Sequence, residues 1–239
     1  MSKEILKVSN LNKSYNKGKS LTVKDINFVV KEKEIVGLVG KNGAGKSTII
    51  KSITGVIPFD SGKITINNFD ISNEGLQAKI YLGYVPDVCN AFDKMTGMEY
   101  LNFVADIFDV NKDIREERIK EFQEHFALGE SIHKLISSYS HGMRQKISIM
   151  ASLMSSPKLW ILDEPTTGLD PLTTSNLLKY IASYAQKGNA VMFSSHNLDV
   201  VKRVCDRVII IKKGNLIEEL TIGELKDKTD EEIENYFVE

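Results

Sequence analysis

A glycine-rich segment at residues 40–48 carries the strongest chemical signal in this sequence. It places four variable residues between a glycine and Gly-Lys-Ser, the spacing of a phosphate-binding loop. Glycines let the backbone curl so that successive amide hydrogens point at phosphate oxygens, and a helix beginning at Lys46 adds the positive end of its dipole. We expect Lys46 to neutralise the outer phosphates and the Ser47 hydroxyl to ligate Mg²⁺. The predicted nucleotide-binding residues are Gly40, Asn42, Gly43, Ala44, Gly45, Lys46, Ser47 and Thr48.

A pair of adjacent acids, Asp163 and Glu164, follows the apolar segment at residues 159–162. A buried parallel strand would bring these carboxylates to the C-terminal edge of the sheet, where α/β proteins bind ligands. Asp163 would hold the Mg²⁺ shell, and Glu164 would accept a proton from the attacking water. His196 follows another apolar strand, so we expect it to reach the same edge, hydrogen-bond the γ-phosphate and position the water. A small-molecule kinase, the alternative, would leave Glu164 and His196 without roles.

These side chains must be positioned by short strands that alternate with helices. Strands are expected at residues 5–8, 21–30, 34–40, 62–67, 80–85, 159–162, 190–194 and 208–211, and helices at 46–54, 96–107, 113–126 and 170–186. This alternation implies right-handed crossovers and a mostly parallel sheet. The predicted fold is α/β, a P-loop NTPase with a mostly parallel core sheet, an antiparallel β subdomain near the N-terminus and an inserted α-helical subdomain.

The chain is expected to form a single domain with one inserted lobe. Residues 1–91 and 157–220 would make the nucleotide-binding core, and residues 92–156 the helical lobe. Thr96 begins a capping-box pattern in front of an apolar helix face. That face is expected to consist of Tyr100, Phe103, Val104 and Ile107. The short tail at residues 221–239 is charged from residue 224 onward, and we expect it to fold weakly or to reach a neighbour.

Composition excludes several classes of protein. The 239 residues are 42% hydrophobic and 26% charged, which is typical of a folded chain and not of a disordered one. Lys and Arg number 31 against 32 Asp and Glu, so a broad nucleic-acid-binding surface is not expected. Cys89 and Cys205 lack metal-binding spacing and predict two ordinary thiols in a reducing compartment. Without a signal peptide or a run of about 20 apolar residues, the protein is expected to be soluble and cytoplasmic.

The order of these motifs resembles the ATPase subunit of ABC transporters along nearly the whole chain. His196 is similar to the switch histidine of that family, and Gly168-Leu169-Asp170 resembles its D-loop. Residues 139–143, Tyr-Ser-His-Gly-Met, resemble the signature sequence LSGGQ. The resemblance implies that Ser140, Gly142 and Met143 act on the ATP of a partner subunit. Tyr15 falls where the family keeps an aromatic ring that stacks on adenine.

The family resemblance also implies partners and a mechanism. Two subunits, identical or related, would face head to tail, bind ATP and Mg²⁺ between them, and move a transmembrane permease subunit on a separate chain. The protein would then lie on the inner face of the cell membrane without contacting nucleic acid. The signature variant and the short tail resemble the branch that exports drugs, peptides or polysaccharides. An importer ATPase, or a soluble ABC-type ATPase acting on nucleic acid or ribosomes, remains an alternative.

Four positions depart from the family pattern. Tyr139 and Met143 stand where the signature has leucine and glutamine. His141 stands where the signature has its first glycine, and Asp87 stands where most relatives have glutamine after Tyr84-Val85-Pro86. The carboxylate of Asp87 can ligate a cation, but it cannot donate a hydrogen bond, and it brings negative charge toward the γ-phosphate. We therefore expect hydrolysis to be slow or to depend on the membrane partner.

Overall fold

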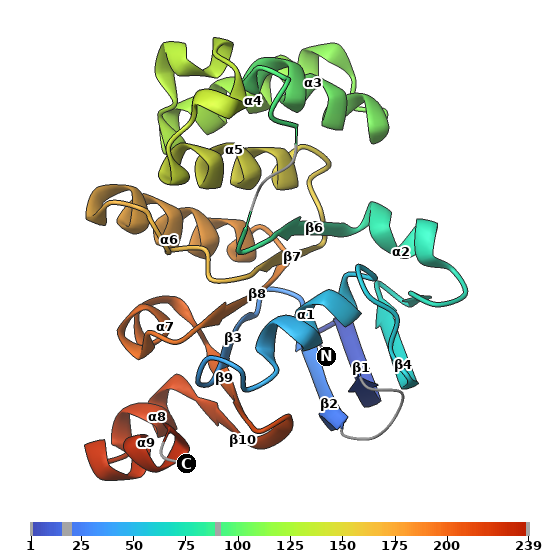
Figure 1. Ribbon diagram of the computed structural model, residues 1–239, viewed down its shortest axis with the longest axis vertical. Helices are drawn as coiled ribbons and strands as arrows, with labels where there is room; N and C mark the ends of the chain where they lie inside the picture. The colour runs from blue at the N-terminus through green and yellow to red at the C-terminus, as the bar shows by residue number, and fades with distance from the viewer. Residues whose placement is uncertain (1, 16–20, 89–91, 238–239) are drawn as a thin grey trace.

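A six-stranded sheet forms the centre of the molecule. The computed structural model describes residues 2–15, 21–88 and 92–237 (Figure 1). The strand order is β10-β9-β3-β8-β7-β6, and every neighbouring pair is parallel except β9 with β10. The strands are β3 (Ile35–Val39), β6 (Leu82–Val85), β7 (Leu159–Leu162), β8 (Ala190–Ser195), β9 (Arg207–Lys212) and β10 (Asn215–Thr221). The expected mostly parallel core sheet is confirmed.

A second, four-stranded sheet lies beside the first and is built from the N-terminal part of the chain. Its order is β2-β1-β4-β5, and all of its pairs are antiparallel, as the sequence predicts. The strands are β1 (Glu4–Ser14), β2 (Leu21–Lys31), β4 (Ser61–Ile66) and β5 (Phe69–Asp70). The helix α1 (Lys46–Ile53) packs between the two sheets, because Ile49, Ile50 and Ile53 are fully buried in the core that the sheets share.

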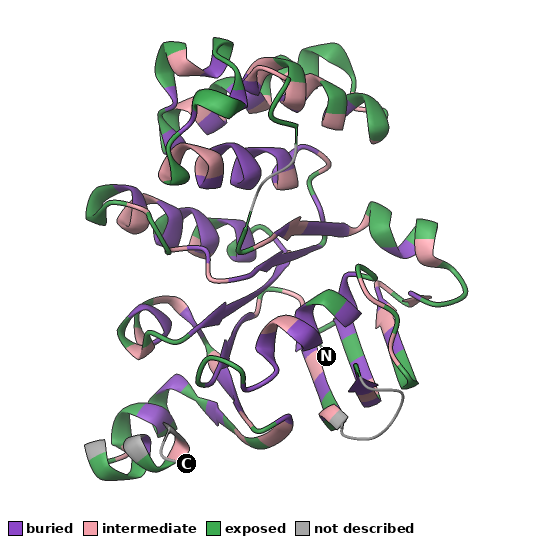
Figure 2. Cartoon of the chain, viewed as in Figure 1, coloured by how far each residue is buried: buried purple, intermediate pink, exposed green. Residues whose placement is uncertain are grey.

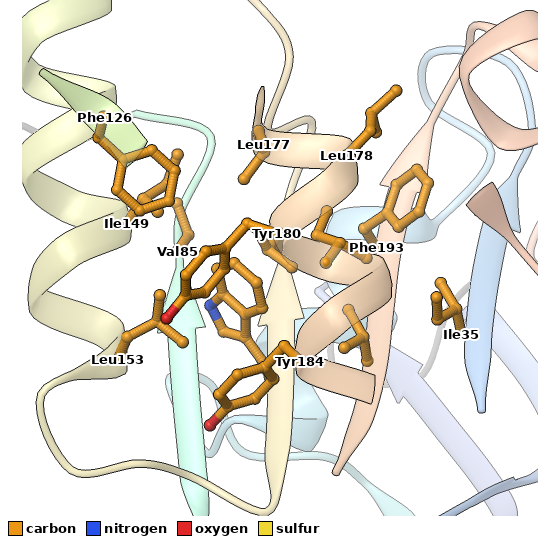
Figure 3. Packing of buried hydrophobic residues seen from close by; sticks show 14 of the residues in the cluster. Ile35, Val85, Phe126, Ile149, Leu153, Leu177, Leu178, Tyr180, Tyr184 and Phe193 are labelled. Carbon is orange, nitrogen blue, oxygen red and sulfur yellow. The ribbon is translucent and has the colours of Figure 1, made fainter. Parts of the chain in front are cut away.

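The face of the central sheet that is opposite to α1 is covered by helices. The helices on this side are α6 (Pro171–Gln186), α7 (Leu198–Val204) and, from the inserted lobe, α5 (His141–Leu153). Fully buried Trp160 of β7 lies at the centre, where it packs edge-on against Tyr180 and Tyr184 and donates a hydrogen bond to Ser152 Oγ at 2.9 Å. Figure 3 shows both tyrosines pointing from α6 toward the strands, and Figure 2 shows β3, β7 and β8 as buried.

The inserted lobe lies above the sheet in Figure 1 and is entirely helical. Its elements are α3 (Gly97–Ile107), α4 (Lys112–Phe126), the 3₁₀ turns Gly129–His133 and Ile136–Ser138, and α5. The capping box at Thr96 is present, with its hydroxyl accepting from Glu99 N at 3.1 Å. The expected inner face of α3 is partly wrong. Leu101 and Ala105 are the buried residues, whereas Phe103 and Ile107 are 37% and 60% exposed.

Three further expectations need correction. The segment at 80–85 is not one strand, because α2 (Gly75–Ile80) ends there and β6 begins at Leu82. The unexpected strand β10 forms a hairpin with β9, with Gly214 at φ 80°. The tail does not fold weakly within the described residues. It forms α8 (Ile222–Asp227) and α9 (Asp230–Phe237), and Leu225 is fully buried.

Two findings bear on the cell-biological expectations. Cys205 is a buried free thiol, while Cys89 lies outside the described residues. In the segments that the structure covers, no helix has both the length and the apolar character needed to span a membrane.

Candidate active site

The segment between β3 and α1 forms an open cradle of backbone amides. Gly43 and Gly45 have φ of 82° and 110°, backbone conformations that residues other than glycine rarely adopt. Gly40 approaches β9 so closely that a Cβ there would lie 2.3 Å from the carbonyl oxygen of Ile211. No side chain caps the start of α1, and its first turn carries no acid. The first amides of α1 therefore have no side-chain cap and could donate to an anion.

Lys46 is folded across this cradle. Its side chain is 6% exposed, and its ammonium donates to the carbonyl oxygens of Gly40 at 2.7 Å and Lys41 at 3.3 Å. The same ammonium lies 3.6 Å from Glu164 Oε1. These contacts place a positive charge at the mouth of the loop, between the cradle and the acids that follow β7.

Asp163 is buried, 1% exposed, and is held by two hydroxyl groups. Ser194 at the end of β8 donates to Asp163 Oδ1 at 2.6 Å, and Ser47 donates to the same oxygen at 3.3 Å. The Ser194 hydroxyl also accepts from the backbone N–H of Glu164 at 2.9 Å. Sequence reasoning did not assign Ser194. The sequence signal is its place directly after the apolar residues 190–193. The parallel pairing of Leu162 with Phe193 then makes Asp163 and Ser194 neighbours.

Glu164 has a strained backbone and an acceptor oxygen that is still available. Its φ is 49°, a left-handed conformation that is uncommon outside glycine. Oε2 lies 3.0 Å from Nδ1 of His196, whose side chain is 59% exposed. Oε1 is buried and has no hydrogen-bond partner among the described residues. Glu164 can therefore accept one more hydrogen bond, next to Lys46 and His196.

The oxygen atoms of Ser47 and Asp163 suit a magnesium ion. Mg²⁺ prefers oxygen ligands, and it usually takes one or two carboxylates from the protein while phosphates and water complete its shell. Across the residues that the structure places, no cluster of three or more His, Cys, Asp or Glu side chains could hold a metal alone. A hydroxyl and a carboxylate that already share a hydrogen bond beside the phosphate cradle fit such a site.

Tyr15 and Asp87, two further predicted residues, lie at the margins of this region. Tyr15 is 59% exposed; its hydroxyl is 3.3 Å from Thr48 Oγ1, and the Lys13 ammonium lies 5.5 Å from its ring centre. Its exposed ring could therefore contact a ligand beside α1. Asp87 is exposed after the end of β6. Burial first, and then the charges of Asp163 and Asp87, raise the pKa of the Tyr84 hydroxyl.

The residues of the signature-like segment lie elsewhere in the molecule. Ser140 is the N-cap of α5, and its hydroxyl accepts from Met143 N at 3.3 Å. Gly142 is in the first turn of this helix, which packs on the opposite face of the sheet from α1 (Figure 1). Asp170 caps α6, and hydrogen bonds from Thr173 hold its pKa below the ordinary value. The structure therefore does not bring Ser140 and Gly142 to the cradle of the same chain.

A phosphate cradle, a buried aspartate beside it and a following glutamate, all at one edge of a mostly parallel sheet, define the class of P-loop nucleotide hydrolases. The family model described as ABC transporter matches residues 23–167. The Linearmycin resistance ATP-binding protein LnrL of Bacillus subtilis (strain 168) is 37% identical over 213 residues, covering 89% of this chain and 68% of that protein.

Solved structures agree with this match. A structure titled "Structure of ATP binding subunit of ABC transporter" has a TM-score of 0.88 and 30% identity, covering 93% of this chain and 92% of the other. The "Dimeric Structure of MJ0796, a Bacterial ABC Transporter Cassette" has a TM-score of 0.83 at 23% identity, covering 91% and 99%, and is similar in fold. The chain belongs to the ABC transporter family, as an ATP-binding subunit with an ATPase domain.

Proposed function

We propose that this subunit hydrolyses Mg-ATP through Glu164, and that hydrolysis powers export through a separate membrane subunit. One observation carries the proposal. A buried carboxylate oxygen of Glu164, lacking a hydrogen-bond partner among the residues described, lies 3.6 Å from the lysine of the phosphate cradle, and the other oxygen lies 3.0 Å from His196. A hydrolase needs such an acceptor next to the terminal phosphate.

Each residue contributes a separate step. Lys46 exchanges its carbonyl contacts for the outer phosphates and neutralises their charge. Glu164 accepts a proton from water, whose oxygen bonds to the γ-phosphorus while the bond to the β–γ bridging oxygen breaks. His196 orients the Glu164 carboxylate and the γ-phosphate. Mg²⁺, held by Ser47 and Asp163, would supply further charge neutralisation; a contribution from Asp87 stays a prediction.

A second copy, or a related subunit, would complete each nucleotide site. Because α5 and α1 lie on opposite faces of one chain, the amides after Ser140 cannot reach ATP in the cradle of that chain. A head-to-tail partner would bring them there, and a cassette with the same fold, MJ0796, has a structure titled as dimeric. ATP would bind the closed pair more tightly than the open one and so shift the population toward closure.

A cleft between the central sheet and the helical lobe is the proposed docking place for the membrane subunit. Its volume is about 280 Å³, and its walls come from β6, α3 and α5. Val88 at its rim is 62% exposed, and the nearby Phe103 and Ile107 of α3 are also exposed. Apolar side chains at the surface next to a cleft are typical of a contact with another protein.

Export is favoured by the similarity to a drug-resistance ATP-binding protein.

The substitution Glu164→Gln tests the proposal. Because the amide cannot accept the proton, we expect turnover to fall by about 10²–10⁴-fold while ATP binding is retained. ATP should then trap a dimer that is visible by size-exclusion chromatography, with or without the membrane subunit. Glu116→Gln is the matched control, because Glu116 is exposed on α4 and far from the cradle. A Glu164→Gln variant that hydrolyses ATP as fast as this control would contradict the proposal.

A further inference from the structure

The first turn of α5 packs directly on the turn that follows Glu164. Gln145, 2% exposed, donates from Nε2 to the carbonyl oxygen of Pro165 at 3.4 Å. A Cβ added at Gly142 would lie 2.9 Å from the carbonyl oxygen of Gly168. The imidazole of His141 lies over the α-carbon of Gly168, so a Cβ there would be 2.1 Å from His141 Cδ2. Because residues 141 and 145 are one helical turn apart, these contacts come from one face of α5.

This turn also determines the position of the catalytic carboxylate. The backbone N–H of Thr167 donates to the carbonyl oxygen of Glu164 at 3.2 Å, and that of Leu169 donates to Thr166 at 3.3 Å. Glu164 enters the turn with φ 49° and Gly168 leaves it with φ 75°. Glycine adopts this conformation without strain, but the left-handed conformation of Glu164 persists only where the surrounding structure holds it. The face of α5 formed by His141, Gly142 and Gln145 is such a support.

We propose that His141 is a positioning residue, which holds the turn at residues 165–168 against α5 and thereby fixes the Glu164 carboxylate between Lys46 and His196. The inference rests on the proposed role of Glu164 as the proton acceptor. His141 supplies a side chain where the LSGGQ form of the signature has glycine, so this chain has a contact that glycine cannot make. The same contact links α5, which would face the nucleotide of a second copy, to hydrolysis in its own cradle.

A double-mutant cycle between His141 and Gly168 tests this role. In Gly168→Ala the new methyl group must displace the imidazole, and alanine is also strained at the φ of 75°. A displacement of about 1 Å at a catalytic site can cost roughly 100-fold in rate. We expect kcat to fall by about that factor, with the KM for ATP unchanged within about threefold, because the cradle and Lys46 are not touched. His141→Ala should lower kcat by about tenfold.

The double variant His141→Ala/Gly168→Ala is decisive. Removing the imidazole makes room for the methyl group, while the left-handed φ of 75° stays strained for alanine in both backgrounds. Gly168→Ala should therefore cost clearly less in kcat in the His141→Ala background than in the wild type. If the two losses instead multiply, the contact does not position Glu164 and the inference is wrong. Gly129→Ala is the matched control, since Gly129 also has a positive φ, 54°, but a Cβ there would have no neighbour within 4 Å. Its kcat should stay at the wild-type value.

A second measurement covers the case in which Gly168→Ala does not fold. Hydrogen exchange of the amides at residues 166–169 should be faster in His141→Ala than in the wild type, and unchanged exchange would overturn the inference. The Glu164→Gln variant separates this inference from the proposed function. If it still hydrolyses ATP, the proposed function is wrong. If it is inactive but the cycle is additive, only the role of His141 is wrong.

Discussion

The hydroxyl of Ser194 joins the two acids of the site, so its removal should have a large effect. Ser194 is fully buried; it donates to Asp163 Oδ1 at 2.6 Å and accepts from Glu164 N at 2.9 Å. A hydrogen bond to a charged group contributes about 1.5–3 kcal/mol, and a buried amide left without an acceptor costs about 1–3 kcal/mol. The substitution Ser194→Ala removes both interactions without adding bulk.

The two contributions sum to about 2.5–6 kcal/mol if they are additive. We expect the lower half of that range, because Ser47 still donates to Asp163 at 3.3 Å. Such a loss is a large share of the free energy of unfolding of a typical domain, which is roughly 5–15 kcal/mol. Ser52→Ala is the matched control: Ser52 is also fully buried, but its hydroxyl donates only to the neutral carbonyl of Thr48 at 2.9 Å. That loss should be about 1 kcal/mol.

Urea unfolding followed by the fluorescence of Trp160 measures both variants. Trp160 is the only tryptophan, and it lies fully buried in β7, the strand that carries Asp163 at its end. The midpoint for Ser194→Ala should fall well below that for Ser52→Ala, with the same m-value. Equal midpoints would refute the assignment of Ser194 as the group that satisfies both the Asp163 carboxylate and the backbone N–H of Glu164. Nucleotide hydrolysis should fall as well, because the Glu164 backbone loses an anchor.

Three other predictions concern single side chains. Lys46→Ala should weaken ATP binding by about 1.5–3 kcal/mol, or roughly 10- to 150-fold in Kd by titration calorimetry. Asp87→Gln should raise ATP turnover; unchanged turnover with and without the membrane subunit would contradict the damping role of Asp87. Burial, and then Asp206, raise the pKa of the Cys205 thiol. Above pH 8.5 the unfolded thiol therefore ionises first, and in a Cys89→Ser background stability should fall by up to about 1.4 kcal/mol per pH unit in urea titrations. Cys205→Ala should remove that slope.

Local patterns were sufficient for the parts of the site that one segment builds alone. The loop at residues 40–48 carries its own glycines and its own helix start, and the caps Thr96 and Asp170 satisfy amides three residues away. Asp163 and Glu164 follow a strand short and apolar enough to be recognised as buried. Each of these features depends on residues adjacent in the sequence, which is why the sequence predicted it.

Contacts between segments that are distant in the sequence could not be predicted from the pattern of apolar and polar residues. The apolar residues of α3 spread around more than half of the helix, and only packing against α5 decides that Leu101 is buried while Ile107 is exposed. Ile80 has the apolar character of the strand that follows, yet it belongs to α2. His141 lies against Gly168 only because α5 packs on the turn after β7. These two segments are separated in the sequence by the end of the lobe, so their contact could not be predicted from it.

The register of the parallel sheet explains why three separate motifs act as one site. Leu162 pairs with Phe193 and Val39 pairs with Ser195, so the cradle, the acids and His196 all begin where neighbouring strands end. Side chains alternate between the faces of a strand, and a slip of β7 by one residue would move the Asp163 carboxylate away from Ser194 and Ser47. Trp160 resists that slip, because its ring packs against Tyr180 and Tyr184 and would otherwise move to the face covered by α1. The hydrophobic core therefore sets catalytic geometry as well as stability: it holds Asp163 and Glu164 level with the phosphate cradle before any nucleotide binds.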